Sequence, residues 1–343
     1  MNTFGRIFRV SIFGESHGEE IGVVIDGVEP GIALSESDFA QDIARRRSGA
    51  KGTTPRVEAD EPHILSGVFE GHTTGAPLTI VFKNTNTRSQ DYAKLIDVPR
   101  PGHADFTANV KYGGFQDPRG GGHFSGRLTL PVVAAGVVAK RILAETIEEE
   151  TNGHVQFRCA ARLVEIGGIA DETRWEAALD AAQKEGDSLG GLVECVVDGI
   201  PAGLGEPFWD SVESRLSHAL FAIPGVRGVE FGDGFAAARM KGSEHNDCFT
   251  PEGIDGHEGL VTPATNHAGG INGGITNGNP LTFRVAFKPT SSIAKTQRTF
   301  DFAKGEMTDF QVPGRHDTCF ALRTPVVVEA MAAIVLADLI DLA

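Results

Sequence analysis

The sequence predicts an α+β fold built around two buried helices. One stretch, from Leu130 to Ala139, is apolar on all sides, and a second, from Val326 to Leu342, is almost as apolar. A helix without a polar face is normally buried in the core of a large protein. Short strand-like segments precede the first of these stretches and separate it from the second. The second stretch carries Glu329, Asp338 and Asp341, which argue against a membrane-spanning helix.

Length, charge and cysteine usage restrict the class of protein. A chain of 343 residues is long enough for two domains or one large domain, and no break in composition settles the count. The formal net charge of -15 argues against nonspecific binding to nucleic acids, yet the arginines cluster around Gly-rich segments, which suits a small anionic ligand. The four cysteines are far apart and nothing at the N-terminus resembles a signal peptide. We therefore expect a reduced, cytoplasmic protein.

A predicted hairpin near the N-terminus presents polar chemistry at its turn. Its strands run from Arg6 to Phe13 and from Ile21 to Val28, and the turn Gly14–Gly18 carries Ser16 and His17. A single histidine in such a turn is often an inert surface residue. The neighbouring serine favours a functional role without requiring one.

A cluster of cations follows the next predicted helix. Ser35 and Asp38 have the spacing of a helix cap, and the helix ends in the run Arg45–Arg47. These arginines either complement the C-terminal end of the helix dipole or, together with Lys51 and Arg56, hold a small polyanion.

Two more predicted strands, His63–Phe69 and Pro77–Phe82, lead to an Arg-Pro-Gly-His-Ala-Asp segment. Proline and glycine stiffen this segment, so that Arg100 and His103 are held in a fixed relation and Asp105 is available to orient the imidazole. The segment is either an acid/base unit or a loop that only ends a strand.

The most Gly-rich motif precedes the first buried helix. The segment Arg119–Arg127 contains three consecutive glycines, followed by His123 and Ser125, with an arginine at each end. Glycine backbone can adopt positive φ and approach a bound anion closely. An ordinary turn is the alternative, because no Lys-Ser/Thr follows to complete a P-loop. Thr129 is expected to cap the helix, with Pro131 in its first turn.

The middle of the chain is predicted to have a structural role only. Thr173 with Glu176, and Asp210 with Glu213, are predicted capping pairs of two amphipathic helices, and Leu192–Val197 is a predicted strand between them.

Polar motifs return in the last third of the chain. The loop Asn266–Asn279, with five glycines, either offers backbone and amide groups to a planar polar ligand or is disordered. A predicted strand, Leu281–Phe287, leads into Lys288–Ser292, which suits a phosphate, and Arg315–Cys319 precedes the second buried helix. The chain has no Rossmann fingerprint and no zinc-ligand spacing. The sequence thus predicts a multiply anionic substrate beside a phosphate-bearing cofactor, without a metal.

Six ordered motifs resemble those of chorismate synthases. They are Gly-Glu-Ser-His-Gly at 14–18, Arg-Pro-Gly-His-Ala-Asp at 100–105, the segment 119–127, Asn-His-Ala-Gly-Gly at 266–270, Lys-Pro-Thr-Ser-Ser at 288–292 and Arg-His-Asp-Thr-Cys at 315–319. The resemblance extends from about Gly5 to Leu339. It implies a single domain over residues 1–343, with central apolar helices sandwiched between antiparallel β-sheets, in a homotetramer.

The resemblance also implies an activity. Chorismate synthases are lyases of the shikimate pathway, which leads to aromatic amino acids. They eliminate phosphate and a ring proton from 5-enolpyruvylshikimate 3-phosphate in a 1,4-anti sense to give chorismate. Reduced FMN is required although no net oxidation occurs.

Site residues follow from the same resemblance. It implies that His17, helped by Ser16, protonates the flavin, and that His103 protonates the leaving phosphate. Asp317 would help a flavin nitrogen accept the substrate proton. Substrate-contacting positions are His17, Arg47, Lys51, Arg100, Ser125, Arg127 and Arg315. Flavin contacts are His123, Phe124, Ser125, Gly273, Lys288, Pro289, Thr290, Ser291, Ser292 and Arg315, and Arg46 matches a position linked to the nicotinamide nucleotide.

Two departures and two rival functions accompany the resemblance. Many relatives have Arg-Ser where this chain has His123 and Phe124, which removes a fixed charge near the flavin, and many have proline at Thr318. NADPH is a possible indirect reductant, which would reduce the flavin either on this enzyme or through an external flavin reductase. The rivals are a phosphotransferase for a sugar-like acid, which lacks a P-loop lysine here, and a non-catalytic anion-binding regulator.

Overall fold

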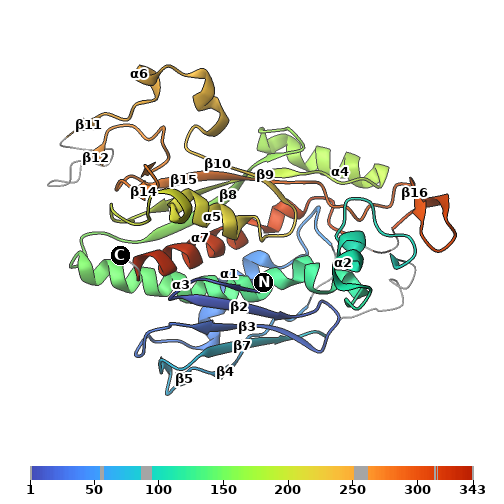
Figure 1. The fold of residues 1–343 in the computed structure, drawn as a ribbon, viewed down its shortest axis with the longest axis horizontal. Coiled ribbons are helices and arrows are strands. Elements are labelled where there is room, and N and C mark those ends of the chain that lie inside the picture. Colours follow the sequence, from blue (N-terminus) through green and yellow to red (C-terminus); the bar gives the residue numbers. More distant parts are fainter. Residues whose placement is uncertain are drawn as a thin grey trace.

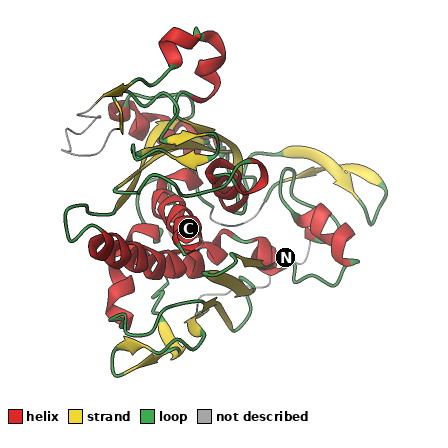
Figure 2. Ribbon diagram, turned by 60° about the vertical axis from the view of Figure 1, so that its left-hand side comes forward, coloured by secondary structure: helices red, strands yellow, loops and turns green. Residues whose placement is uncertain are grey.

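The computed structural model describes residues 2–54, 58–85, 95–250, 262–312, 314 and 316–341. Two helices lie between two sheets, so the chain has three layers (Figures 1 and 2). Every strand pairing within the two larger sheets is antiparallel. The predicted α+β sandwich with central helices is therefore confirmed.

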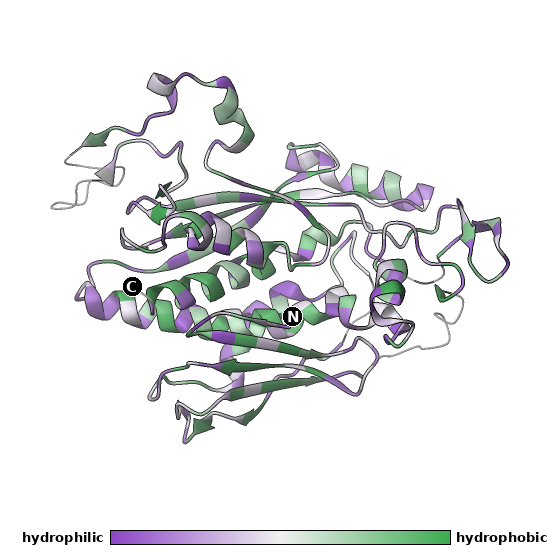
Figure 3. Cartoon of the chain, in the orientation of Figure 1, coloured by the Kyte–Doolittle hydropathy of each residue, from purple (hydrophilic) through white to green (hydrophobic). Residues whose placement is uncertain are grey.

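The middle layer consists of α3 (Thr129–Glu150) and α7 (Pro325–Ile340). Both helices are coloured mainly as hydrophobic in Figure 3, and almost all of α7 is buried. They pack in direct contact, because a Cβ atom on Gly136 would lie 2.3 Å from the Cβ of Ala330. Only glycine fits at this crossing.

One face of the helix layer is covered by a five-stranded sheet in the order β1-β2-β3-β7-β4. Its strands are β1 (Thr3–Phe4), β2 (Arg9–Gly14), β3 (Glu20–Asp26), β7 (Leu78–Lys83) and β4 (His63–Ser66). Alternate residues of β3, namely Ile21, Val23 and Ile25, are fully buried, and β3 contacts α3. This period of two is what places one face of the sheet on the helices.

The opposite face is covered by a four-stranded sheet in the order β10-β15-β9-β8. Its strands are β10 (Val226–Phe231), β15 (Leu281–Phe287), β9 (Gly191–Asp198) and β8 (Arg158–Ile166). Val193, Cys195 and Val197 are fully buried along β9, which contacts α7.

Shorter elements surround these layers. The remaining helices are α1 (Ala40–Arg46), α2 (Asp105–Tyr112), α4 (Trp175–Glu185), α5 (Val212–Leu220) and α6 (Gly242–His245). The short strands are β5 (Val68–Phe69), β6 (His72–Thr73), β11 (Phe249–Thr250), β12 (Thr262–Pro263), β13 (Ile271–Asn272), β14 (Ile275–Thr276), β16 (Gln297–Asp301) and β17 (Glu306–Phe310). Single 3-10 turns are η1 (Glu36–Phe39), η3 (Arg119–Phe124), η4 (Gly126–Leu128), η5 (Glu172–Arg174), η6 (Phe208–Asp210), η7 (Gly234–Arg239) and η8 (Phe320–Arg323).

Several predicted helix caps are wrong. The side chains that cap η5 and α5 are those of Asp171, two residues before Thr173, and Ser211, one residue after Asp210, because each of them accepts from a free backbone N–H. Thr129 lies inside α3, and its hydroxyl donates to the Gly126 carbonyl at 2.7 Å. The box formed by Ser35 and Asp38 is confirmed.

Two loop predictions are also corrected. The strand predicted from His63 to Phe69 is split at Gly67, whose φ of 88° interrupts the extended backbone. The loop Asn266–Asn279 is ordered as the small β13–β14 hairpin, so disorder is the wrong alternative.

Buried carboxylates of α7 are satisfied by cations. Glu329 accepts hydrogen bonds from Arg45 at 2.6 and 2.7 Å and from Lys140 at 2.8 Å. Asp338 accepts from Arg215 at 2.5 Å and from the backbone N–H of Arg6 at 2.6 Å.

No helix in the described part of the chain is both long and apolar enough to span a membrane.

Candidate active site

A cleft of about 640 Å³ opens where α3 and α7 begin. It is lined by the segments that precede α2, α3 and α7 and by the loops that follow α5 and β15, which are far apart in sequence. The predicted site residues on its wall are His103, His123, Phe124, Lys288, Pro289, Thr290, Ser291, Ser292 and Asp317. Four of the six sequence motifs therefore meet in one place.

The three-glycine turn separates the two predicted catalytic histidines. Gly120 and Gly121 have φ values of 61° and 83°, which side chains rarely adopt. A Cβ on Gly120 would lie 2.7 Å from His17 Cδ2, and one on Gly121 would lie 3.2 Å from His103 Cε1. The turn is therefore glycine because an imidazole lies against its backbone on either side.

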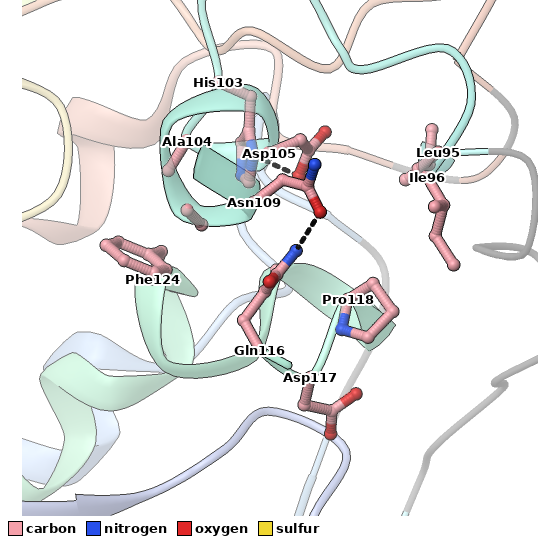
Figure 4. Close-up of a pocket in the computed structure, with 12 residues that line it drawn as sticks. Leu95, Ile96, His103, Ala104, Asp105, Asn109, Gln116, Asp117, Pro118 and Phe124 are labelled. Atoms are coloured by element: carbon pink, nitrogen blue, oxygen red, sulfur yellow. Dashed lines mark hydrogen bonds and ion pairs between the residues drawn. The ribbon is translucent and has the colours of Figure 1, made fainter. Parts of the chain in front are cut away.

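His103 belongs to a tightly bonded cluster at the start of α2 (Figure 4). Its Nδ1 lies 2.6 Å from Asp105 Oδ1 and 3.1 Å from Nη2 of Arg100. A guanidinium can only donate, and Nδ1 takes part in one such bond at a time. The shorter contact favours an Nδ1–H that donates to Asp105, so that Asp105 and Arg100 both engage Nδ1 and not Nε2.

Asp105 is held in its charged form. Burial by itself raises the pKa of this carboxyl. Hydrogen bonds from Arg100 and His103 outweigh burial and hold the pKa of Asp105 well below its usual range. Arg100 donates to both carboxylate oxygens, at 2.7 and 2.8 Å, and to the Ser292 hydroxyl at 3.1 Å. The guanidinium of Arg100 thus ties the α2 loop to the loop after β15.

Ser16 and His17 lie behind the glycine turn, and both are buried. The backbone N–H of Ser16 donates to the Gly122 carbonyl at 3.1 Å. Asn84 fixes the same hairpin turn, because its side-chain amide donates to the carbonyls of Glu15 and Gly18 at 3.1 and 2.9 Å. Ser16 and His17 do not line the cleft itself.

His123, Phe124 and Ser125 end the glycine turn. His123 Nδ1 lies 2.8 Å from the Gly14 carbonyl, so this nitrogen carries the proton and donates it. Phe124 is 38% exposed and presents an apolar surface to the cleft. The Ser125 hydroxyl accepts from the backbone N–H of Arg127 at 3.3 Å.

The loop after β15 forms the opposite wall. Lys288 donates to the Ser291 hydroxyl, which in turn donates to the Gly102 carbonyl at 2.7 Å. Burial and the neighbouring Arg227 lower the pKa of Lys288. A cation and several hydroxyls gathered in one short loop are suitable donors for a phosphate.

Asp317 lies at the base of the cleft, 9% exposed. Its carboxylate accepts from Nη2 of Arg323 at 2.7 Å and from the backbone N–H of Thr54 at 2.8 Å. These two donors connect Asp317 to the loop after α1 and to the turn before α7.

Some predicted anion-binding cations bond to the protein's own acceptors. Lys51 pairs with Glu176 and Asp180 of α4, at 2.5 and 2.9 Å. Arg47 is exposed and donates to the Ala59 carbonyl. Neither Lys51 nor Arg47 lines the cleft.

Arg46 and Arg127 are buried together beneath the glycine turn. Arg127 pairs with Asp60 at 2.8 Å and with Glu58 at 3.0 Å. Arg46 donates to the Thr129 hydroxyl at 3.0 Å and has only 3% of its surface exposed. In this arrangement Arg46 joins α1 to α3, which is a structural position.

Gly273, a further predicted residue, does not line the cleft. Gly273 forms the open turn between β13 and β14, and its neighbour Gly274 packs on Ser211 at the start of α5. Arg315 lies outside the described residues.

Sequence reasoning missed Arg227 and Arg323, which line the cleft, and Asp60, which pairs with both buried arginines. Arg323 follows the Arg315–Cys319 motif by a few residues, so its position was the available signal. Asp60 had no signal, because it lies among other acidic residues, Glu58 and Glu61, in a loop without a recognised motif.

The cleft combines an oriented imidazole, a buried carboxylate and several cations. Among the described residues no cluster of histidine, cysteine or acidic side chains could hold a metal ion. Acid–base groups beside phosphate-binding donors suit the elimination of a phosphate group. The fold and site thus correspond to a phosphate-eliminating lyase.

Comparisons with known proteins give the family. The family model described as "Chorismate synthase" matches residues 8–340. The chain is 60% identical over 338 residues to a chorismate synthase of Chitinophaga pinensis, covering 98% of this chain and 96% of that protein. It is 44% identical over 355 residues to one from Dehalococcoides mccartyi, with the same coverages. A solved structure titled "Crystal Structure of Chorismate Synthase" matches with a TM-score of 0.72 and 26% identity, covering 98% of this chain and 92% of that one.

The chain belongs to the chorismate synthase family. It converts 5-enolpyruvylshikimate 3-phosphate to chorismate, in the pathway to the aromatic amino acids. The family uses reduced FMN. The phosphotransferase and regulator alternatives are set aside by this membership.

Proposed function

We propose that the 640 Å³ cleft binds reduced FMN and 5-enolpyruvylshikimate 3-phosphate together, and that the elimination takes place beside the glycine turn. The observation that carries this proposal is the convergence on one cleft of His103, Asp317 and the Lys288–Ser292 loop. An oriented acid, a carboxylate and a set of phosphate donors are the groups that this reaction requires.

The donors present fit a flavin mononucleotide. Lys288, Thr290 and Ser291 line one wall and could hold its phosphate, while Phe124 and Phe320 offer apolar surface to its ring system. When bound, reduced flavin supplies the electronic step of the elimination.

His103 is the proposed general acid for the leaving phosphate. Its Nδ1 is engaged by Asp105 at 2.6 Å, so a proton carried on Nε2 can be delivered without loss of the ring's orientation. Arg100 holds Asp105 in place, and this positioning of Asp105 requires no contact between Arg100 and the ligand.

His17 and Asp317 are the proposed groups for the other proton movements. His17 lies against Gly120 on the far side of the turn, where Ser16 accompanies it. Asp317 lies in the cleft and its carboxylate can take up a proton from the flavin or the substrate. His17 and His103 are assigned different protons because the glycine turn lies between them.

The remaining substrate-binding residues are proposals that require an exchange of partners. Arg47, Lys51 and Arg127 donate to protein acceptors in the chain by itself. A substrate with one phosphate and two carboxylates could replace some of these acceptors. Ser125 would contribute a hydroxyl, and Arg315 and Gly273 would complete the binding residues.

Assembly, reductant and location are also proposals. We infer a homotetramer, a nicotinamide nucleotide or an external reductase as the source of reducing equivalents, and a cytoplasmic location. The buried position of Arg46 does not support direct contact with NADPH within one chain.

An anaerobic assay tests the proposed cofactor and site. Purified protein, FMN and the enolpyruvyl substrate are mixed with and without dithionite, and phosphate, chorismate and the flavin spectrum are followed. We expect many turnovers for each reduced flavin, because the elimination is redox-neutral. Turnover without any flavin, or one flavin oxidised for each chorismate, would show the cofactor assignment to be wrong.

A further inference from the structure

Two buried Arg–Asp pairs in this chain are built alike. Arg323 lies 2.7 Å from Asp317, and the two side chains are 14% and 9% exposed. Arg215 lies 2.5 Å from Asp338, with side chains 13% and 0% exposed. Each guanidinium also stacks on a phenylalanine. Arg323 lies 5.0 Å from the centroid of the Phe320 ring, and Arg215 lies 4.8 Å from the centroid of the Phe4 ring.

Their surroundings differ. Asp338 also accepts the backbone N–H groups of Arg6 and Ile7, so its pair with Arg215 closes the N-terminal segment onto α7. That is a structural function. Arg323 and Asp317 instead form part of the cleft wall.

The Arg323 guanidinium is incompletely satisfied by the protein. Its Nη2 donates to Asp317, whereas its buried Nε has no hydrogen-bond partner among the described residues. A buried donor without an acceptor costs about 1–3 kcal/mol, so such groups in a native site usually have a further partner.

The positive charge around Arg323 also favours the binding of an anion. Arg46 is buried close by, and burial together with the positive charge of Arg323 lowers the pKa of Arg46. Arg227 and Lys288 are further cations on the cleft wall, while Asp317 is its one carboxylate among the lining residues. The lining as a whole therefore carries excess positive charge.

We propose that Arg323 is a ligand-binding residue of the cleft, which pairs with Asp317 through Nη2 and binds a phosphate or carboxylate group of the substrate or the flavin through its remaining donors. This inference rests on the proposed function of the cleft. It adds a residue to the binding site and explains why a cation–carboxylate pair lies where an anionic ligand is bound.

Binding measurements on Arg323→Gln test the proposal. The dissociation constants of FMN, riboflavin and the enolpyruvyl substrate are measured by calorimetry, along with the melting temperature. We expect roughly a 10- to 100-fold weaker affinity for one anionic ligand, the scale of a hydrogen bond to a charged group. Loss for FMN but not riboflavin identifies the flavin phosphate, and loss for the substrate alone identifies a substrate anion.

Arg215→Gln is the matched control. It removes an equally buried, equally stacked arginine, so it should lower the melting temperature while the affinities for all three ligands stay at wild-type values. If Arg323→Gln behaves like this control, Arg323 is only structural and the proposal is wrong.

Arg323→Lys covers the possibility that the glutamine variant does not fold. Lysine keeps the charge but loses the forked donors, and we expect a three- to tenfold loss of affinity for the same ligand. Wild-type affinity for every ligand in this variant overturns the proposal. If the wild-type protein binds neither FMN nor the substrate, the proposed function itself is wrong and the proposal for Arg323 is rejected with it.

Discussion

The Nδ1 atom of His103 lies 2.6 Å from Oδ1 of Asp105, and Arg100 donates to both oxygens of the same carboxylate. This relationship fixes which imidazole nitrogen is engaged by the protein, namely Nδ1. It also makes Asp105 a positioning residue for a histidine from its own loop.

Removal of His103 should slow the chemistry without preventing flavin binding. His103→Ala is expected to lower kcat by about 10²- to 10⁴-fold, the usual contribution of a positioned general acid. Asp105→Asn should give a smaller loss, because His103 is still present. A loss is expected because the new amide can donate to Nδ1 and so hold the imidazole in the wrong tautomer. Steady-state kinetics under anaerobic reducing conditions measure both, and wild-type turnover in His103→Ala would make His103 structural.

The glycine turn should be intolerant of a single methyl group. Gly120→Ala would place a Cβ 2.7 Å from the His17 ring at a φ of 61°. Gly305→Ala is the control, because Gly305 has a φ of 72° and nothing within 4 Å of the new Cβ.

Both alanine variants should lose about 1–2 kcal/mol of unfolding free energy from the left-handed backbone. Only Gly120→Ala should also lose turnover, since it alone displaces an imidazole. Denaturant unfolding and kcat are compared for the two variants, and equal kcat values would contradict a catalytic arrangement around the turn.

Asp317→Asn should separate proton transfer from stability. Asparagine keeps the size, but it cannot take up a proton, and its one amide oxygen can accept from only one of Arg323 and Thr54, which donate to different oxygens of Asp317. We expect near wild-type flavin and substrate affinities and the loss of most turnover. Early melting combined with a normal rate in the folded fraction would assign Asp317 to structure alone.

The C-terminal end of α7 should contribute a pH dependence to stability. Burial, followed by the nearby charges of Glu29 and Asp338, raises the pKa of Asp341 to about 6. The unfolded value is about 3.9, so the folded protein takes up this proton first as pH falls. Asp341 therefore destabilises the fold above about pH 6, and this cost disappears as pH falls toward about 4.

Asp341→Asn tests that direction. The variant should melt at a higher temperature than the wild type at pH 8, and the difference should shrink at pH 4.5. A difference that is constant across this range would mean that the titration of Asp341 does not affect stability.

Calorimetry tests the single-domain prediction for residues 1–343. One hydrophobic cluster joins β3, α3, α7 and β9, so we expect one cooperative unfolding transition. Two separated transitions would divide the chain into two domains.

Local sequence was sufficient for the elements and the motifs. The two apolar stretches could only be buried helices, and the strand Leu281–Phe287 has the predicted bounds because its period of two is unbroken. Serine, histidine and glycine motifs identified the family because their order along the chain is specific. These features depend on neighbours within a few residues.

Only the tertiary structure decided which charged groups face the cleft. Arg46 and Arg323 are both arginines beside a motif, yet one is buried on Thr129 and the other lines the cleft. Asp60 and Glu329 gained their roles from cations more than ten residues away along the chain or on other helices. Long-range pairing of this kind depends on how the layers pack, and no local pattern of residues encodes it.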